Sequence, residues 1–139
     1  MARLLKKKVK SETKPHEEVR QKVVLLADDS EMVRNFHSYV LKNAGYKIVS
    51  AIDGADALEK LLMNNIDLVA TDINMPNMDG YELVKRIRAM AEYEDMPIII
   101  VSTESESQDK QKGYDAGANV YIIKPTSPDQ LVESVNLLI

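Results

Sequence analysis

Five polar residues directly follow apolar stretches of strand length: Asp28, Asp29, Asp72, Ser102 and Lys124. If these stretches are parallel strands of one sheet, their carboxyl ends meet at one edge, where open α/β sheets bind their ligands. Three carboxylates gathered there would repel one another and raise one another's pKa. A hard divalent cation such as Mg²⁺, which prefers oxygen ligands, is the natural neutraliser. We therefore predict a magnesium site at this edge.

The serine and the lysine supply the remaining parts of a phosphoryl-transfer site. Lys124 would bring a positive charge and Ser102 a hydroxyl donor, on the side opposite the cation. A carboxylate surrounded by a cation, an ammonium group and a hydroxyl is equipped to accept a phosphoryl group. Asp79 is a further acid in a neighbouring loop. Asp53 precedes Gly54 at a predicted helix start, and we interpret it as a helix cap rather than a ligand.

The elements that must position these residues alternate along the chain. Five nearly continuous stretches of Val, Ile and Leu are typical of strands buried on both faces, at 23–27, 46–51, 66–71, 97–101 and 119–123. The segments between them repeat apolar residues with helical spacing. Five strand-then-helix units with short connections predict a doubly wound α/β domain, in which helices cover both faces of a five-stranded parallel sheet.

The helical segments carry recognisable ends and buried faces. The first should begin at Ser30, end at Gly45, and bury one apolar face that comprises Val33, Phe36, Val40, Leu41 and Ala44. The last should begin at Ser127, with Pro128 in its first turn. The fourth has no apolar residue over 103–112, so Tyr114, Ala116 and Ala118 would be the main residues that hold it. We expect this helix to be the least firmly anchored element.

Composition excludes several classes of protein. The 139 residues include no cysteine, which removes disulfides, cysteine-ligated metals and thiol catalysis. No apolar run is long enough to span a membrane, and the charged N-terminus is unlike a signal peptide. These features predict a cytoplasmic protein without membrane contact.

Charge is divided unevenly along the chain. Residues 1–22 carry eight basic and three acidic residues, whereas residues 23–139 carry ten basic and nineteen acidic residues. We predict a flexible basic tail at 1–22 joined to an acidic domain at 23–139.

Four segments resemble the receiver domain of two-component response regulators, a family whose single-domain members include chemotaxis regulators. They are LLADDS at 25–30, VATDINMPNMDG at 69–80, IIIVST at 98–103 and AGANVYIIKP at 116–125. Ser102 lies 30 residues after Asp72, Lys124 lies 22 residues after Ser102, and Tyr121 stands three residues before Lys124. The resemblance extends over about 22–139 and implies a flavodoxin-like sheet with strand order 2-1-3-4-5.

The resemblance implies a role for each matching residue. Asp72 would be the phosphoacceptor, which takes its phosphoryl group from the phosphohistidine of a histidine kinase. Asp29, Asp72 and the backbone carbonyl of Asn74 would ligate Mg²⁺, with Asp28 acting through a water. Ser102 and Lys124 would each bind a phosphoryl oxygen.

Further implied roles concern switching and dephosphorylation. Tyr121 would be a switch aromatic whose rotamer follows the movement of Ser102. The side chains of Asn74 and Glu104 would tune self-dephosphorylation, and the peptide bond between Lys124 and Pro125 would be cis.

Three positions depart from the usual family pattern. Thr126 stands where Phe is usual, Thr103 stands where a small Ala or Gly is commoner, and Ser102 replaces the more frequent Thr. None of the three removes a chemical role. The first two bear on kinetics and on the output surface.

These inferences favour a phosphorylation-driven switch that catalyses only its own phosphorylation and dephosphorylation and is otherwise not an enzyme. It would be a stand-alone receiver without an effector domain, and it would dock a protein target through the face of its fourth helix, fifth strand and fifth helix. A phosphorelay shuttle and a receiver fragment of a larger regulator are the alternatives.

Two other classes of function are less well supported. A Mg²⁺-dependent phosphatase of the haloacid dehalogenase type needs an Asp two residues after its nucleophile, where this chain has Ser30 or Glu31. Nucleic-acid binding through the basic tail is not expected, because the domain is acidic and residues 1–22 contain no aromatic residue for stacking.

Overall fold

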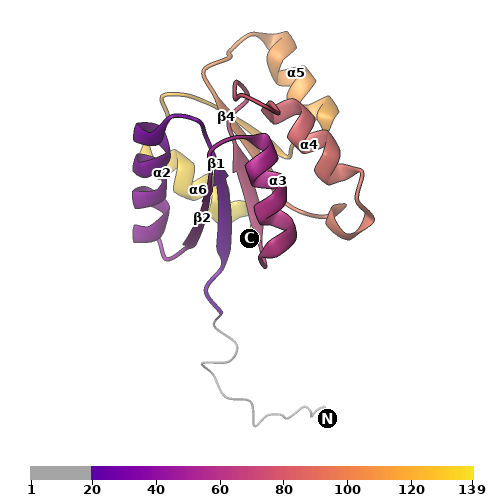
Figure 1. Ribbon diagram of the computed structural model, residues 1–139. Coiled ribbons are helices and arrows are strands. Elements are labelled where there is room, and N and C mark those ends of the chain that lie inside the picture. Colours follow the sequence, from indigo (N-terminus) through magenta and orange to yellow (C-terminus); the bar gives the residue numbers. More distant parts are fainter. Residues whose placement is uncertain (1–19) are drawn as a thin grey trace.

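Five parallel strands form one sheet in the computed structural model, which describes residues 20–139 (Figure 1). The strand order is β2-β1-β3-β4-β5, so the predicted doubly wound, flavodoxin-like sheet is confirmed. In chain order the elements are β1 (Val23–Ala27), α2 (Glu31–Asn43), β2 (Lys47–Ala51), α3 (Gly54–Met63), β3 (Leu68–Thr71), α4 (Gly80–Arg88), a 3₁₀ turn η1 (Ala91–Tyr93), β4 (Ile98–Ser102), α5 (Ser107–Ala116), β5 (Val120–Ile123) and α6 (Pro128–Leu138).

The sheet separates two apolar cores, because successive side chains of a strand point to opposite faces. In β1, Leu25 faces the core beneath α3, α4 and α5, whereas Val24 and Leu26 face the core beneath α2 and α6. All five residues of β1 are buried, as continuous apolar stretches predict for a central strand. Each fully buried aliphatic side chain contributes about 1.5–3 kcal/mol, which fixes the sheet as a rigid support for its polar edge.

Side chains cap the helices at the predicted places. Ser30 Oγ accepts a hydrogen bond from the Val33 N–H at 3.3 Å, and Ser127 Oγ accepts one from the Gln130 N–H at 3.1 Å. Asp53 caps α3 by accepting from the Asp56 N–H at 2.7 Å, as interpreted from the sequence. Gly45 follows α2 with a φ of +101°, a left-handed conformation that favours glycine.

The buried face of α2 differs from the prediction. Phe36 and Ala44 were expected on the buried face, but both are exposed, Phe36 over 48% of its surface, and His37 is buried instead. His37 lies three residues before Val40 and four before Leu41, so it shares their face more closely than Phe36 does. The apolar character of Phe36 therefore misled the sequence-based assignment.

The helix expected to be least anchored also begins later than the polar segment suggested. It starts at Ser107, because the backbone N–H of Glu106 is bound by the Asp109 carboxylate at 3.2 Å, which caps the helix there. Its buried residues are Gly113 and Ala116, whereas Tyr114 is 46% exposed. A helix that buries only such small residues gains little from packing.

Arg20 and Gln21, which precede β1, already contact the rest of the domain. Arg20 pairs with the Asp67 carboxylate at 2.8 Å, and Gln21 donates to the Gly45 carbonyl at 3.2 Å. The rest of the predicted basic tail, residues 1–19, lies outside the described residues. Within 20–139, no helix combines the length and the apolar character that crossing a membrane requires.

Candidate functional site

Three carboxylates converge at the carboxyl edge of the sheet. Ala27 and Thr71 are paired in register on the neighbouring strands β1 and β3, so the residues that follow them emerge side by side. The Asp72 N–H donates to the Ala27 carbonyl at 2.9 Å, which ties the two strand ends together. One carboxylate oxygen from each of Asp28, Asp29 and Asp72 lies within 4.8 Å of the others.

The ammonium group of Lys124, the residue that follows β5, joins this cluster. Its Nζ lies 2.7 Å from Asp28 Oδ2 and 3.2 Å from Asp72 Oδ2. The Lys124 N–H donates to the Ser102 carbonyl at 2.8 Å, and the Lys124–Pro125 peptide bond is cis, as the resemblance implied. The Lys124 ammonium thus pairs with Asp28 and Asp72, two of the three carboxylates in the cluster.

Burial perturbs the Asp72 carboxyl. Removal from water raises the pKa of Asp72 above its ordinary value, and the neighbouring Asp28 raises it further. The Lys124 ammonium and a 2.7 Å hydrogen bond from the Ile73 N–H act in the opposite direction without cancelling the effect of burial. Ionisation of Asp72 in the folded protein therefore costs free energy, and a bound cation would offset this cost.

Ser102 and Tyr121 are linked through one residue, Glu104. Ser102 is fully buried at the end of β4, and its Oγ accepts from the Glu104 N–H at 3.1 Å. The Tyr121 hydroxyl donates to the Glu104 backbone carbonyl at 2.7 Å. The Glu104 side chain accepts from the Asn74 amide at 2.8 Å, so the loops after β3 and β4 meet across the site.

Close backbone packing holds the loop after Asp72. The Gly80 N–H donates to the Ile73 carbonyl at 2.8 Å, and a Cβ at position 80 would lie 2.0 Å from the Asp72 carbonyl oxygen. Asp79 caps α4 through the Glu82 N–H at 2.9 Å. The Asp79–Gly80 pair of the sequence therefore packs directly against the backbone of Asp72 and Ile73.

Sequence reasoning missed two contacts that shape the site. Arg34 Nη1 donates to the Asp28 backbone carbonyl at 2.7 Å. The position of Arg34 in the first turn of α2 was the sequence feature that could have predicted this contact. Burial and the positive charge of Lys124 both lower the pKa of the buried His37 imidazole. In the sequence, His37 stands among apolar helix positions, which gave no indication that its imidazole lies near Lys124.

The two departures Thr103 and Thr126 come together beside Lys124. Both line one hollow on the α2 side of the site, which also includes Met32 and Phe36. Thr126 lies at the entrance to α6, and its hydroxyl bonds the Gln130 side chain at 2.8 Å. Two of the three side chains that differ from the usual pattern thus lie on one surface beside Lys124.

Comparisons with known proteins agree with this geometry. Residues 24–136 match the family model described as the response regulator receiver domain. The chain is 40% identical over 114 residues to a chemotaxis protein CheY homolog of Campylobacter jejuni, covering 81% of this chain and 88% of that protein. Over 101 residues it is 38% identical to a gliding motility regulatory protein of Myxococcus xanthus, covering 73% of this chain but only 13% of that protein.

Solved structures show the same likeness in three dimensions. The chemotaxis response regulator CheY4 of Vibrio cholerae superposes with a TM-score of 0.81 at 35% identity, covering 86% of this chain and all of that one. A family model that matches most of the chain, together with this fold and this sheet-edge cluster, is sufficient for assignment. The chain belongs to the response regulator receiver domain family of two-component signalling and is CheY-like.

Proposed function

We propose that this receiver domain is a phosphorylation-driven switch that accepts a phosphoryl group from a histidine kinase on Asp72. The observation that carries the proposal is the position of Asp72, which shares one cluster with Asp28 and Asp29 and lies 3.2 Å from the Lys124 ammonium. A nucleophilic carboxylate needs positive charge on both sides to approach an anionic phosphoryl group.

The donor set fits Mg²⁺, because it consists of hard carboxylate oxygens whose charge a single ammonium group does not balance. Asp29, Asp72 and the Asn74 carbonyl would hold the ion, with Asp28 acting through a water. When bound, Mg²⁺ would neutralise charge between the carboxylate and the phosphoryl group.

The residues of this chain then divide the chemistry. An Asp72 carboxylate oxygen bonds to phosphorus while the phosphorus–nitrogen bond of phosphohistidine breaks, and the imidazole stays with the kinase. The Lys124 ammonium and the Ser102 hydroxyl take the phosphoryl oxygens. The Ser102 Oγ accepts from the Glu104 N–H, which leaves the hydroxyl proton free to be donated. Asn74 and Glu104, whose side chains are hydrogen-bonded to each other at 2.8 Å, would orient a hydrolytic water and so set the lifetime of the phosphorylated state.

Phosphorylation would be transmitted through Ser102 to the face formed by α5, β5 and α6. Movement of Ser102 toward a phosphoryl oxygen breaks the 3.1 Å contact with Glu104, and Glu104 in turn holds the Tyr121 hydroxyl. α5 is free to follow because its buried residues are small. A protein target would recognise this face.

The wider setting is also proposed. We infer a cytoplasmic location, a domain boundary near residue 22, no nucleic-acid binding, and a stand-alone receiver. The stand-alone form is supported by the Campylobacter jejuni relative, of which the chain covers 88%. A receiver within a larger regulator is the alternative, since the chain covers 12% of the Escherichia coli sensor histidine kinase RcsC.

Labelling by a small phosphodonor such as acetyl phosphate should require Mg²⁺. We expect excess chelator to remove labelling, and Asp29→Ala to raise the Mg²⁺ concentration needed for half-maximal labelling by about tenfold or more, since one carboxylate ligand is lost. Glu31→Ala is the matched control, because it removes an exposed acid two residues away from Asp29. Full labelling in chelator would contradict the cation site.

Hydrogen exchange should locate the switch. Addition of beryllofluoride with Mg²⁺, which mimics the phosphoryl group, is expected to change amide protection within residues 102–124, above all in α5. The physical reason is that the Ser102–Glu104–Tyr121 contacts rearrange while the two apolar cores stay packed. Mass spectrometry of peptides from β1 provides the internal control. Unchanged protection throughout 102–124 would show that the switch lies elsewhere.

A further inference from the structure

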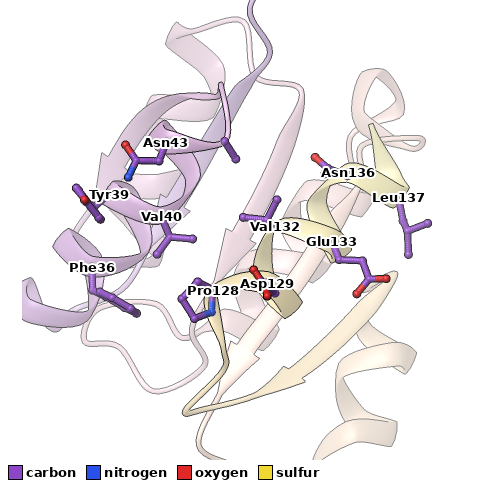
Figure 2. A pocket seen from close by; sticks show the side chains of 11 residues that line it. Phe36, Tyr39, Val40, Asn43, Pro128, Asp129, Val132, Glu133, Asn136 and Leu137 are labelled. Atoms are coloured by element: carbon purple, nitrogen blue, oxygen red, sulfur yellow. The ribbon is translucent and has the colours of Figure 1, made fainter.

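An open groove separates α2 from α6 on the face of the sheet that they cover (Figure 2). Val40 and Val132 lie between the two helices, and the rim carries Phe36, Tyr39 and Leu137 with exposed fractions of 48%, 65% and 80%. The groove has a volume of about 690 Å³. Large apolar side chains left open in this way mark a surface that is covered by something else.

The charge of the groove indicates the chemistry of its occupant. Asp129 and Glu133 of α6 line it, and its lining residues include no lysine or arginine (Figure 2). An apolar floor beside two acids suits a segment that is apolar on one side and basic on the other.

The N-terminal residues of the same chain have this composition. Residues 1–10, MARLLKKKVK, contain five basic residues and no acid. Their apolar residues Met1, Leu4, Leu5 and Val9 are spaced so that they would share one face if the segment is helical when bound. Four basic residues, Arg3, Lys6, Lys7 and Lys10, would then lie on the opposite side, available to the acids on the rim, whereas Lys8 would fall on the apolar face next to Leu4.

The described part of the chain begins near one end of the groove. Gln21 donates to the carbonyl of Gly45, and the preceding residue, Ala44, lines the groove. The ten Cα–Cα steps from residue 10 to residue 20 can span up to about 33–36 Å when the chain is extended. The 11-residue helix α6 is only about 16 Å long, so the connection reaches along the whole groove. A short tether also gives an effective concentration in the millimolar range, so weak contacts suffice.

We propose that residues 1–10 dock into the α2–α6 groove of their own chain. Leu4, Leu5 and Val9 pack on the apolar floor, and the basic side chains of the opposite side (Arg3, Lys6, Lys7 and Lys10) face Asp129 and Glu133. The groove is thereby assigned to a segment of this chain, separately from the acidic cluster and from phosphorylation.

Paramagnetic relaxation in the full chain tests the docking directly. The chain has no cysteine, so Ala2→Cys provides a single attachment point for a nitroxide. The spin label should remove most of the methyl signal intensity of Val40 and Val132, and reduction of the nitroxide should restore it. Methyl groups of Leu62 on α3, on the opposite face of the sheet, should be unaffected.

Variants then separate the possible occupants. Leu4→Ser/Leu5→Ser and Asp129→Lys/Glu133→Lys should each restore the groove signals, whereas Glu59→Lys/Glu94→Lys, which reverses two exposed acids elsewhere, should not. Undiminished groove signals in the labelled chain would overturn the proposal. So would signal loss in unlabelled protein mixed with spin-labelled protein, since that places a second copy in the groove. Equal loss over all acidic surfaces would overturn it as well, because it would show unspecific attraction.

Discussion

Replacing Asp72 by Asn is expected to abolish labelling by acetyl phosphate, with no signal above that of denatured protein. Asn has nearly the shape of Asp, but its amide oxygen is not a nucleophile that can form an acyl phosphate. The residue lies at the centre of the sheet-edge cluster, 3.2 Å from the Lys124 ammonium. Intact-mass spectrometry after incubation with Mg²⁺ and the phosphodonor measures the result.

Stability measurements on the same variant distinguish lost chemistry from lost folding. Burial raises the pKa of Asp72 in the folded state, so ionisation of this group destabilises the fold at pH values above its unfolded pKa. Asp72→Asn removes that charge, and its free energy of unfolding at neutral pH without Mg²⁺ should equal or exceed that of the wild type. Asp79→Asn, which keeps a capping side chain, should still be labelled. Undiminished labelling of Asp72→Asn would identify another acceptor.

Gly80→Ala is expected to lower the free energy of unfolding by at least about 2 kcal/mol, because overpacking against a rigid neighbour is strongly destabilising. The new Cβ would lie 2.0 Å from the Asp72 carbonyl oxygen, and that atom belongs to the backbone beside the phosphoacceptor. Relief of the clash must move Asp72 or α4, so labelling should fall as well. Urea unfolding and phosphodonor labelling measure the two effects.

Gly45→Ala is the matched control for this second prediction. Gly45 has a φ of +101°, and a Cβ there would meet nothing within 4 Å, so the substitution costs only the left-handed strain of roughly 1–2 kcal/mol. Its labelling should match the wild type. Equal labelling of Gly80→Ala and Gly45→Ala would show that the close approach does not position the site.

The sequence was sufficient to predict which residues meet at the sheet edge. Parallel strands joined by helices must all end at the same edge, so polar residues directly after apolar stretches converge whatever the details of the helices. Asp28, Asp72 and Lys124 follow this rule, and the structure brings them within contact of one another. What these residues do chemically remains a prediction.

Features that depend on three-dimensional packing could not be predicted from the sequence pattern. In α2, hydrophobicity favours Phe36 over the adjacent His37 as the buried residue, but His37 is the one that is buried. The contact between Gly80 and the Asp72 carbonyl depends on how the loop closes, which the Asp-Gly pair alone does not specify. The start of α5 depended on one side-chain cap at Asp109.

The connection between Ser102 and Tyr121 runs through the main chain of Glu104. Its N–H donates to the serine and its carbonyl accepts from the tyrosine, whereas its side chain accepts a hydrogen bond from Asn74. A substitution at position 104 leaves both main-chain groups in place, because every residue except proline supplies them. Substitutions of this side chain, to which we assign a part in hydrolysis, would therefore leave the main-chain link between the serine and the tyrosine in place. If the proposed switch operates, changes of signal lifetime and changes of signal transmission can therefore arise independently at this one position.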